Sequence, residues 1–451
     1  MRIRSIFIFA FLSAIVTLFA CQDKVRLELS HRVEVLVKDT MLYDNFMMDF
    51  DGISMHKSKY AKRKGKDECK VYYSEIQTFE QLIEEASVEE IMKIYENKQN
   101  LFFNPSETNT IVERNADAIS SRSDDQPLEG IKIALDPVYI GGSMRMAEIE
   151  QKLLKIVNRK GDTVFLDEGL INLETAVIAA IKLQKLGAEI LLTRKKVSES
   201  AFGKSFFTWL NEDFRTWVKD DYEKGNLTKE KADYLRQKAD AIYVYNQYFK
   251  PKELKARVER INRFKPDLTL AIGYNIDETN WLLRSSGDVL KPIHENYALV
   301  YVPGGFMAGE LETPRDRMEF LRLMLTKDYK NSIKFAELLS LQFNYKLGTP
   351  PLSSKLDFEY LDENSIKVKE GIYARNLSIT RLVHGPVCYG VPLCLDNENE
   401  FLAIGKDELK VGKLTTSKRV EQVADAFVEA IKTYFSPDGK ISETDLIERE
   451  I

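Results

Sequence analysis

The amino-acid sequence predicts an α/β fold organised around a parallel β-sheet, and three consecutive elements carry that prediction. The apolar run IKIAL at 131–135 is short and rich in branched residues, as a buried strand is. Apolar residues then recur at helical spacing over 172–186, and Gly187 ends that helix. The run AEILLT at 188–193 is a second buried strand. A strand, a helix and a strand in this order imply a parallel sheet.

The first of these strands runs directly into a loop. Asp136-Pro137 is a strand-exit signal, and Gly141-Gly142 forms a turn. Ligands of parallel sheets bind at the carboxyl ends of the strands. We therefore expect a ligand site at residues 136–142.

This stretch resembles the zinc-dependent N-acetylmuramoyl-L-alanine amidases of bacterial cell walls. That family follows its first strand with Asp-Pro-Gly-His-Gly-Gly, whose His binds zinc, and this chain has Tyr139 at the His position. The family's second zinc ligand is a Glu ahead of the first helix, which Glu168 matches. Gly187 follows Glu168 by 19 positions, as in the family, and Leu192-Thr193-Arg194 closes the next strand.

A second matching segment spans residues 254–275. It resembles the family segment in which a helix precedes a strand that ends at the third zinc-binding His. Pro266-Asp267, the apolar strand at 268–272 and Asn275 keep the frame, but the His position is Gly273. A glycine offers no side chain to a metal.

The last matching strand carries the catalytic acid/base in the family. Pro386 and Asn397 keep their places around it, but the position of the family's Glu is Val391. A closing helix over 417–435 completes the match.

The resemblance implies a three-layer α/β sandwich with a mostly parallel sheet. We expect this amidase-like domain at 129–436, with a helical insertion at 199–253. A small N-terminal helical or mixed region with a linker precedes it at 21–128. A lipoprotein signal peptide occupies 1–20, and a C-terminal tail occupies 437–451.

The first residues have a basic start and an apolar core that is too short for an ordinary spanning helix. They end in Leu18-Phe19-Ala20-Cys21, which resembles the lipobox of bacterial lipoproteins. The segment predicts cleavage before Cys21 and lipid attachment to its sulfur, and hence a chain anchored to a membrane of the bacterial cell envelope. A plain signal peptide with a chance Cys is the alternative.

The N-terminal region has few other signals. Two helical patterns are expected at 78–87 and 88–103, and the basic run at 57–66 is interpreted as a solvated loop rather than a contact for a membrane or an anionic polymer. His31 and His56 are expected at the surface.

The insertion is rich in aromatic and charged residues. Gly225-Asn226 separates two helical patterns, and Thr228 is placed to cap the second. We expect a helical hairpin over the cleft. Its aromatic stripe either forms a local core or stacks on sugars.

Charge and cysteine content exclude other classes. A net charge of −5 and a pI near 5.7 give no case for a nucleic-acid partner. After Cys21 only Cys69, Cys388 and Cys394 remain, without metal-binding spacing, and we interpret them as buried or free thiols.

A catalytic zinc needs three protein ligands and one open position. At the matched positions only Glu168 binds metal as the family's ligand does, since an ordinary phenol has a pKa near 10 and is a poor ligand. We therefore expect no cofactor and no catalytic residue. An oxygen-rich metal site rebuilt from other nearby side chains is the alternative, and it would hold zinc; those side chains are Glu148, Glu150, Asp277, Glu278 and His294. The residues expected to face the cleft are Asp136, Tyr139, Glu150, Glu168, Tyr274 and Asn275.

Three functions follow from the sequence. The first is a lipid-anchored, catalytically degenerate protein that binds peptidoglycan or a wall-remodelling protein. The second is a working amidase with a rebuilt metal site, which cuts the amide between muramic acid and L-alanine. The third places the function in the insertions and leaves the cleft vestigial.

Overall fold

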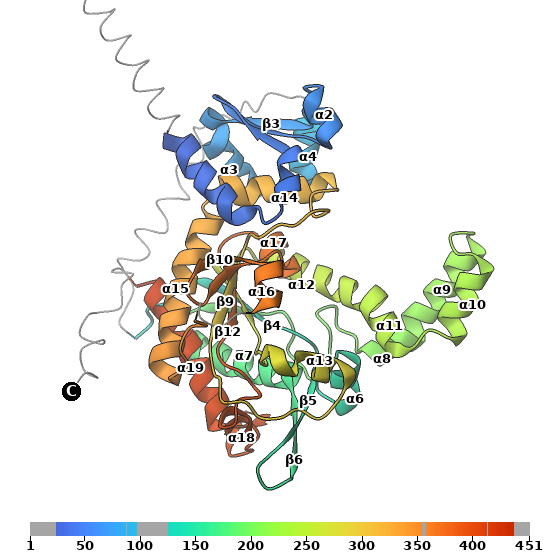
Figure 1. Ribbon diagram of the computed structural model, residues 1–451, viewed down its shortest axis with the longest axis vertical. Helices are drawn as coiled ribbons and strands as arrows, with labels where there is room; N and C mark the ends of the chain where they lie inside the picture. Colours follow the sequence, from blue (N-terminus) through green and yellow to red (C-terminus); the bar gives the residue numbers. More distant parts are fainter. Residues whose placement is uncertain (1–23, 87, 97–124, 354–357, 413, 437–451) are drawn as a thin grey trace, which may run out of the picture.

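The computed structural model describes residues 24–86, 88–96, 125–353, 358–412 and 414–436. Cys21, the signal segment, most of the expected linker and the C-terminal tail lie outside these residues. The described chain is built around one seven-stranded sheet, of order β10-β11-β9-β12-β8-β4-β7 (Figure 1).

Four neighbouring strands of this sheet are parallel, as the sequence predicts. They are β12 (Val387–Val391), β8 (Leu268–Ile272), β4 (Lys132–Pro137) and β7 (Glu189–Leu192). The strand β9 (Leu299–Val302) is antiparallel to β12, and β11 (Ile372–Ala374) runs parallel to β9. The strand β10 (Ile366–Lys369) closes the edge antiparallel to β11. All residues of β8 are buried, as expected for a central strand covered on both faces.

Helices cover both faces, which confirms the predicted three layers (Figure 1). One face carries α7 (Glu168–Lys185), α15 (Asp328–Leu347) and α19 (Lys418–Tyr434), whose apolar residues join the strands in the largest core. The other carries α12 (Lys250–Phe264) and α17 (Ser378–Leu382) over β4, β8 and β12.

The helix α7 begins earlier than the periodicity suggests. Asp167 is its N-cap and accepts a hydrogen bond from the Leu170 N–H, so that Glu168 is the first helical residue. Its end is as predicted, because Gly187 has φ +96° just after the last turn.

Shorter elements connect these layers. Between β4 and α7, the strands β5 (Leu153–Val157) and β6 (Thr163–Asp167) form an antiparallel hairpin that the sequence did not predict. The other connecting elements are α6 (Met144–Ile149), α13 (Glu278–Ser286), α14 (Pro314–Leu325), α16 (Glu359–Asn364), α18 (Glu400–Ile404), β13 (Leu409–Val411) and β14 (Leu414–Thr416).

The N-terminal region is a small mixed α/β body that packs on α14 at the top of the molecule in Figure 1. It contains a helix at 24–36, η1 (Thr40–Asp44), β1 (Phe46–Met48), β2 (Gly52–Met55), α2 (Lys59–Arg63), β3 (Cys69–Tyr72), η2 (Tyr73–Glu75), α3 (Ile76–Glu85) and α4 (Val88–Glu96). Apolar side chains of α14 complete its core, so this body and the large domain share one helix.

Two expectations for this region have opposite outcomes. The basic run contains the short helix α2 and is largely exposed, as a solvated segment is. The surface assignment of His56 was wrong: the residue is fully buried after β2, with Nδ1 3.4 Å from Oδ1 of Asp67. Its ring lies beside the Lys66 carbonyl and Asp67, and no local sequence signal shows this burial. His31 is exposed.

The insertion is helical, and its hairpin projects away from the sheet (Figure 1). It comprises α8 (Phe206–Trp209), η3 (Leu210–Phe214), α9 (Arg215–Glu223), α10 (Lys229–Gln237), α11 (Ala241–Val244) and η4 (Tyr245–Phe249). Thr228 caps α10 as predicted, but the expected position over the cleft is wrong for the hairpin itself. Its aromatic residues form a local core, because Phe206, Trp209, Phe214 and Phe249 are buried against one another.

Two further features agree with the sequence. Cys69, Cys388 and Cys394 are buried free thiols. Within the described ranges no helix has the length and apolarity needed to cross a membrane.

Candidate functional site

The loop after β4 has an unusual backbone. Tyr139, Gly141 and Gly142 all have positive φ, at +61°, +53° and +88°. Glycine adopts this region freely, whereas a bulky residue such as Tyr139 is strained there and needs its surroundings to hold it. Strain of this kind gathers at binding and active sites, so the contacts of this loop decide how the site is built.

A buried carboxylate holds the loop from one side. The Glu150 carboxylate accepts hydrogen bonds from the Ile140 and Gly141 N–H groups at 2.9 and 2.7 Å, and from the Tyr245 hydroxyl at 2.5 Å. Burial raises the pKa of Glu150, while these donors oppose the rise. Asp167 accepts from the Gly142 N–H at 2.5 Å. The backbone donors of the loop are therefore bound to protein.

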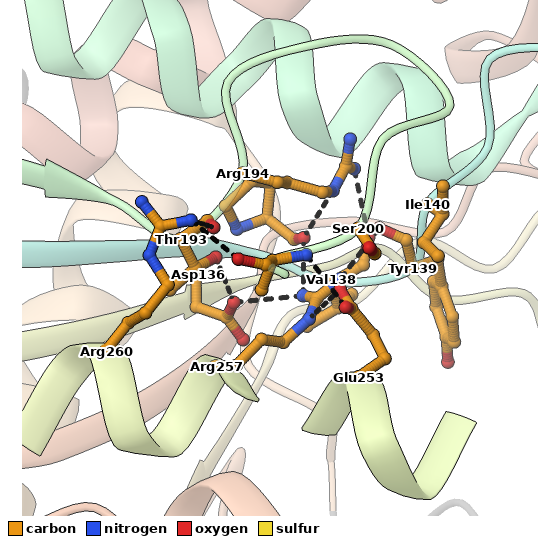
Figure 2. A network of polar contacts seen from close by, with 12 residues as sticks. Asp136, Val138, Tyr139, Ile140, Thr193, Arg194, Ser200, Glu253, Arg257 and Arg260 are labelled. Carbon is orange, nitrogen blue, oxygen red and sulfur yellow. Dashed lines mark hydrogen bonds and ion pairs between the residues drawn. The ribbon is translucent and has the colours of Figure 1, made fainter. Parts of the chain in front are cut away.

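An arginine network holds the loop from beneath (Figure 2). Arg257 donates to Oδ1 of Asp136 at 2.9 Å, to Oε1 of Glu253 at 2.8 Å and to the Pro137 carbonyl at 2.8 Å. Arg194 donates to the Pro137 carbonyl at 3.0 Å and to the Gly169 carbonyl at 2.5 Å. These six residues connect β4, α7, α12 and the segment after β7 below the loop.

The charged groups of this network shift the pKa values of its two arginines. Burial by itself would lower the pKa of Arg257, but the carboxylates of Asp136 and Glu253 raise it above the ordinary value. Burial and the nearby Arg257 charge lower the pKa of Arg194 to about 10. Both guanidinium groups are cations at neutral pH, and they fix the loop through its carbonyl groups.

Glu168 belongs to a second, separate cluster. Its side chain is 1% exposed, and its Oε2 lies 3.3 Å from Nη1 of Arg284 and 3.5 Å from Nζ of Lys152. The same Lys152 Nζ lies 4.1 Å from the ring centroid of Tyr139. Glu168 Oε1 has no hydrogen-bond partner among the described residues. One ammonium group thus links the carboxylate to the strained tyrosine.

The place of a side chain at position 273 is taken by a tyrosine. A Cβ built on Gly273 would lie 2.5 Å from Cε2 of Tyr389 and still closer to its hydroxyl. Burial raises the pKa of Tyr389 well above its ordinary value, and the neighbouring Tyr139 and Glu168 raise it further. Tyr389 is therefore a neutral phenol that fills the space beside Gly273.

A cavity of about 420 Å³ opens beside this cluster. It extends from the carboxyl ends of β4, β8 and β12 across the face of β9, towards α13 and α16. Its wall combines polar and aromatic side chains, and the aromatic ones include Trp281, Tyr297, Tyr301, Phe358, Tyr360 and Tyr389. Four cations also line it, namely Lys152, Lys250, Arg284 and Arg375.

Only some of the residues that the sequence predicted to face one cleft line this cavity. Tyr139, Glu150, Tyr274, Asn275 and Val391 line this cavity. Asp136 lies beneath the loop in the arginine network, and Glu168 lies behind Lys152 and Arg284. Tyr274 directs its hydroxyl away to Thr175, at 2.8 Å.

Several cavity residues had no signal in the sequence. Lys152 precedes a strand of the unpredicted hairpin, Arg284 lies on a helix whose role was unassigned, and Arg375 follows β11. Tyr389 sits between matched positions, and only the missing side chain at 273 could have suggested it.

The donors present do not fit a catalytic zinc ion. Glu168 is one carboxylate and is already paired with two cations, while Tyr389 fills the space at Gly273. Across the described ranges, no three His, Cys, Asp or Glu side chains gather as a metal site does.

The alternative oxygen-rich set is dispersed, so the rebuilt metal site proposed from it is not formed. Glu148 pairs with Lys155, Glu150 holds the loop, and the exposed His294 pairs with Glu398.

No protein-family model and no curated protein matches this chain. Solved structures do match. The CwlD amidase of Clostridioides difficile, solved in complex with the GerS lipoprotein, is 15% identical, with 68% of this chain and 98% of that chain covered and a TM-score of 0.35.

The N-acetylmuramyl-L-alanine amidase Ami1 of Mycobacterium smegmatis is 11% identical, with 68% of this chain and 98% of that chain covered and a TM-score of 0.36. The catalytic domain of the CwlV amidase of Bacillus (Paenibacillus) polymyxa var. colistinus is 14% identical, with 67% of this chain and 97% of that chain covered and a TM-score of 0.34. Every one of these TM-scores is below 0.5.

Proposed function

We propose that this protein is a cell-envelope lipoprotein with an amidase-like domain that binds peptidoglycan, or a wall-remodelling protein, without cleaving it. One observation carries the proposal. Glu168, the one retained ligand position, is paired with Lys152 and Arg284, and the Tyr389 ring fills the space beside Gly273, while the neighbouring cavity remains open.

This site lacks the groups that amide hydrolysis requires. An amidase needs an activated water and an acid that protonates the leaving amine. Val391 lines the cavity where the family's carboxylate would stand, and it transfers no proton. Loss of a general acid or base typically costs about 10²–10⁴ in rate. The Glu168 carboxylate is already paired with two cations, Arg284 and Lys152.

The cavity retains what binding needs. Its volume lies within the roughly 300–1,000 Å³ typical of small-ligand sites, and its walls carry aromatic rings and a few cations. Flat rings such as those of Trp281 and Tyr360 offer large rigid contact surfaces to a sugar or a peptide. Peptidoglycan supplies both.

The test is sedimentation of the purified residues 24–451 with insoluble cell wall, beside zinc analysis and a digestion assay. We expect co-sedimentation, less than one zinc per chain and no release of stem peptides. Trp281→Ala, in the cavity wall, should reduce co-sedimentation at least tenfold. Trp217→Ala, on the projecting hairpin, is the matched control and should not.

Two outcomes would overturn the proposal. One zinc per chain, with release of stem peptides that a chelator abolishes, would make the protein a working amidase. Loss of wall binding in Trp217→Ala but not in Trp281→Ala would move the function from the cavity to the insertion.

The envelope location has its own test. Cys21 is the proposed lipidated residue, and several acyl chains anchor stably because each buried methylene contributes about 0.8 kcal/mol. Cys21→Ser should shift the full-length chain from the membrane fraction to the soluble fraction. Equal membrane retention of variant and wild type would reject the anchor.

A further inference from the structure

Arg375 occupies a fixed position on the cavity wall. It follows β11 directly, its N–H donates to the Val302 carbonyl at 3.0 Å, and its own carbonyl accepts from Oγ1 of Thr380 at 2.8 Å. The backbone that carries this side chain is therefore anchored on both sides. A guanidinium presented from such a position is ready to bind without reorganising the chain.

Two tyrosine rings orient the guanidinium group. Its central carbon lies 4.8 Å from the ring centroid of Tyr360 and 5.4 Å from that of Tyr301, and it donates a hydrogen bond to the Tyr360 hydroxyl. Rings at these distances hold a guanidinium by cation–π attraction and leave its planar edge available for hydrogen bonds.

No carboxylate in the described part of the chain lies within ion-pair distance of Arg375. Two other arginines of this domain differ in this respect, because Arg257 has Asp136 and Glu253 and Arg284 has Glu168. A half-buried guanidinium has given up part of its hydration, and an anion that enters the cavity would restore the lost interactions.

The remaining charges of the cavity are already engaged. Lys152 and Arg284 share the Glu168 carboxylate, and Glu278 accepts from the Tyr360 N–H at 3.1 Å. Lys250 is exposed at the base of the insertion. Arg375 is thus the inner cation of this cavity that an incoming anion would meet.

We propose that the cavity binds a short wall peptide through its free terminal carboxylate, with Arg375 as the residue that binds the carboxylate. This inference rests on the proposed function and names the part of peptidoglycan that enters the cavity. A guanidinium fork matches the two oxygens of a planar carboxylate, and the aromatic walls suit the body of a peptide.

Isothermal titration calorimetry with two soluble probes tests this. One is a synthetic muramoyl pentapeptide that ends in a free carboxylate, and the other is the same compound as its terminal amide. The free acid should bind at least tenfold more tightly than the amide. Sodium phosphate at the same concentration should not displace the acid.

Variants of Arg375 test whether this side chain causes the preference for the free acid over the amide. Arg375→Gln should weaken binding of the acid at least tenfold and leave the amide unchanged, so that the two probes become equal. Arg375→Lys keeps the charge without the planar fork and should give an intermediate affinity. Lys255→Gln, an exposed change on α12 outside this cavity, should alter neither probe.

The outcomes separate this inference from the proposed function. Equal binding of acid and amide, or displacement of the acid by phosphate, would overturn the carboxylate role while wall binding stands. Binding of insoluble wall without binding of either probe would also overturn it, because another part of the polymer would then be the ligand. Failure of wall and probes together would overturn both proposals.

Discussion

Two ionic clusters lie beside the loop at 138–142, and they differ in how completely their carboxylates are bound. Beneath the loop, the carboxylates of Asp136, Glu150 and Glu253 are bound by arginine, hydroxyl or backbone N–H groups. On the cavity side, Glu168 Oε1 has no partner within the described residues, and Arg375 has no carboxylate there. The same residue types thus fix the backbone in one cluster and retain binding capacity in the other.

We therefore assign the cluster beneath the loop to stability and the cluster on the cavity side to binding. A closed network loses much when one member is removed, because the remaining charges are buried without compensation. Removal of Arg375 should cost less, since this side chain is only half-buried and lines the cavity. The variants below test this contrast, in order of expected effect.

Arg257→Met should be the most damaging change. It leaves Asp136 and Glu253 buried without their cation, and breaking one side of a buried ion pair typically costs about 3–5 kcal/mol. Urea unfolding of the purified domain measures this cost. Lys255→Met, two positions away on the same helix and 70% exposed, is the control and should change stability by less than about 0.5 kcal/mol. A cost below about 1 kcal/mol for Arg257→Met would show that the network is not a stabilising unit.

Glu174 extends the contrast to a buried carboxyl group without a cation. Its hydrogen bond at 2.7 Å comes from the Thr416 hydroxyl, and burial raises its pKa to about 7. The folded chain holds this proton more tightly than the unfolded chain, so the group stabilises folding below about pH 4.5. That contribution is lost as the pH rises to about 7, and by linkage it amounts to about 3 kcal/mol.

Glu174→Gln stays neutral and should lose this pH dependence. Relative to wild type, its free energy of unfolding should rise by about 3 kcal/mol between pH 4 and pH 8. Denaturant titrations at both pH values give the result, with the exposed Glu189→Gln as the control. Parallel pH profiles of Glu174→Gln and wild type would contradict the raised pKa.

Gly273→Ala tests the filled position in the cavity cluster. The new methyl group meets the Tyr389 ring, and overpacking of this kind typically costs about 1–3 kcal/mol. In a Tyr389→Ala background the ring is absent, and the same change should cost less than about 0.5 kcal/mol. Additive costs in this double-mutant cycle would mean that Tyr389 does not occupy the place of a side chain at 273.

Arg375→Gln should have the smallest effect on stability. It removes two cation–π contacts and a hydrogen bond at a half-buried site, worth about 1 kcal/mol or less. Unfolding in urea beside Arg257→Met makes the comparison direct. A loss as large as that of Arg257→Met would assign Arg375 to the scaffold, not to the cavity.

The sequence by itself determined the parallel core of the sheet. Periodicity placed the strands that became β4, β7 and β8 and the helix that became α7, because apolar spacing along the chain reports which face each element buries. The lipobox-like segment and the helical nature of the insertion were also local patterns. The positions of Tyr139, Gly273 and Val391 at one edge followed from the order of the strands.

Only the tertiary structure decided what those positions do. Lys152, Arg284 and Arg375 come from three separate parts of the chain. Lys152 and Arg284 meet at Glu168, which is 116 positions from Arg284, and Arg375 has no carboxylate partner among the described residues. The burial of His56 and the outward direction of the insertion depend likewise on packing between distant segments. Periodicity is a property of neighbouring residues, whereas charge pairing and the filling of a glycine's space depend on distances across the fold.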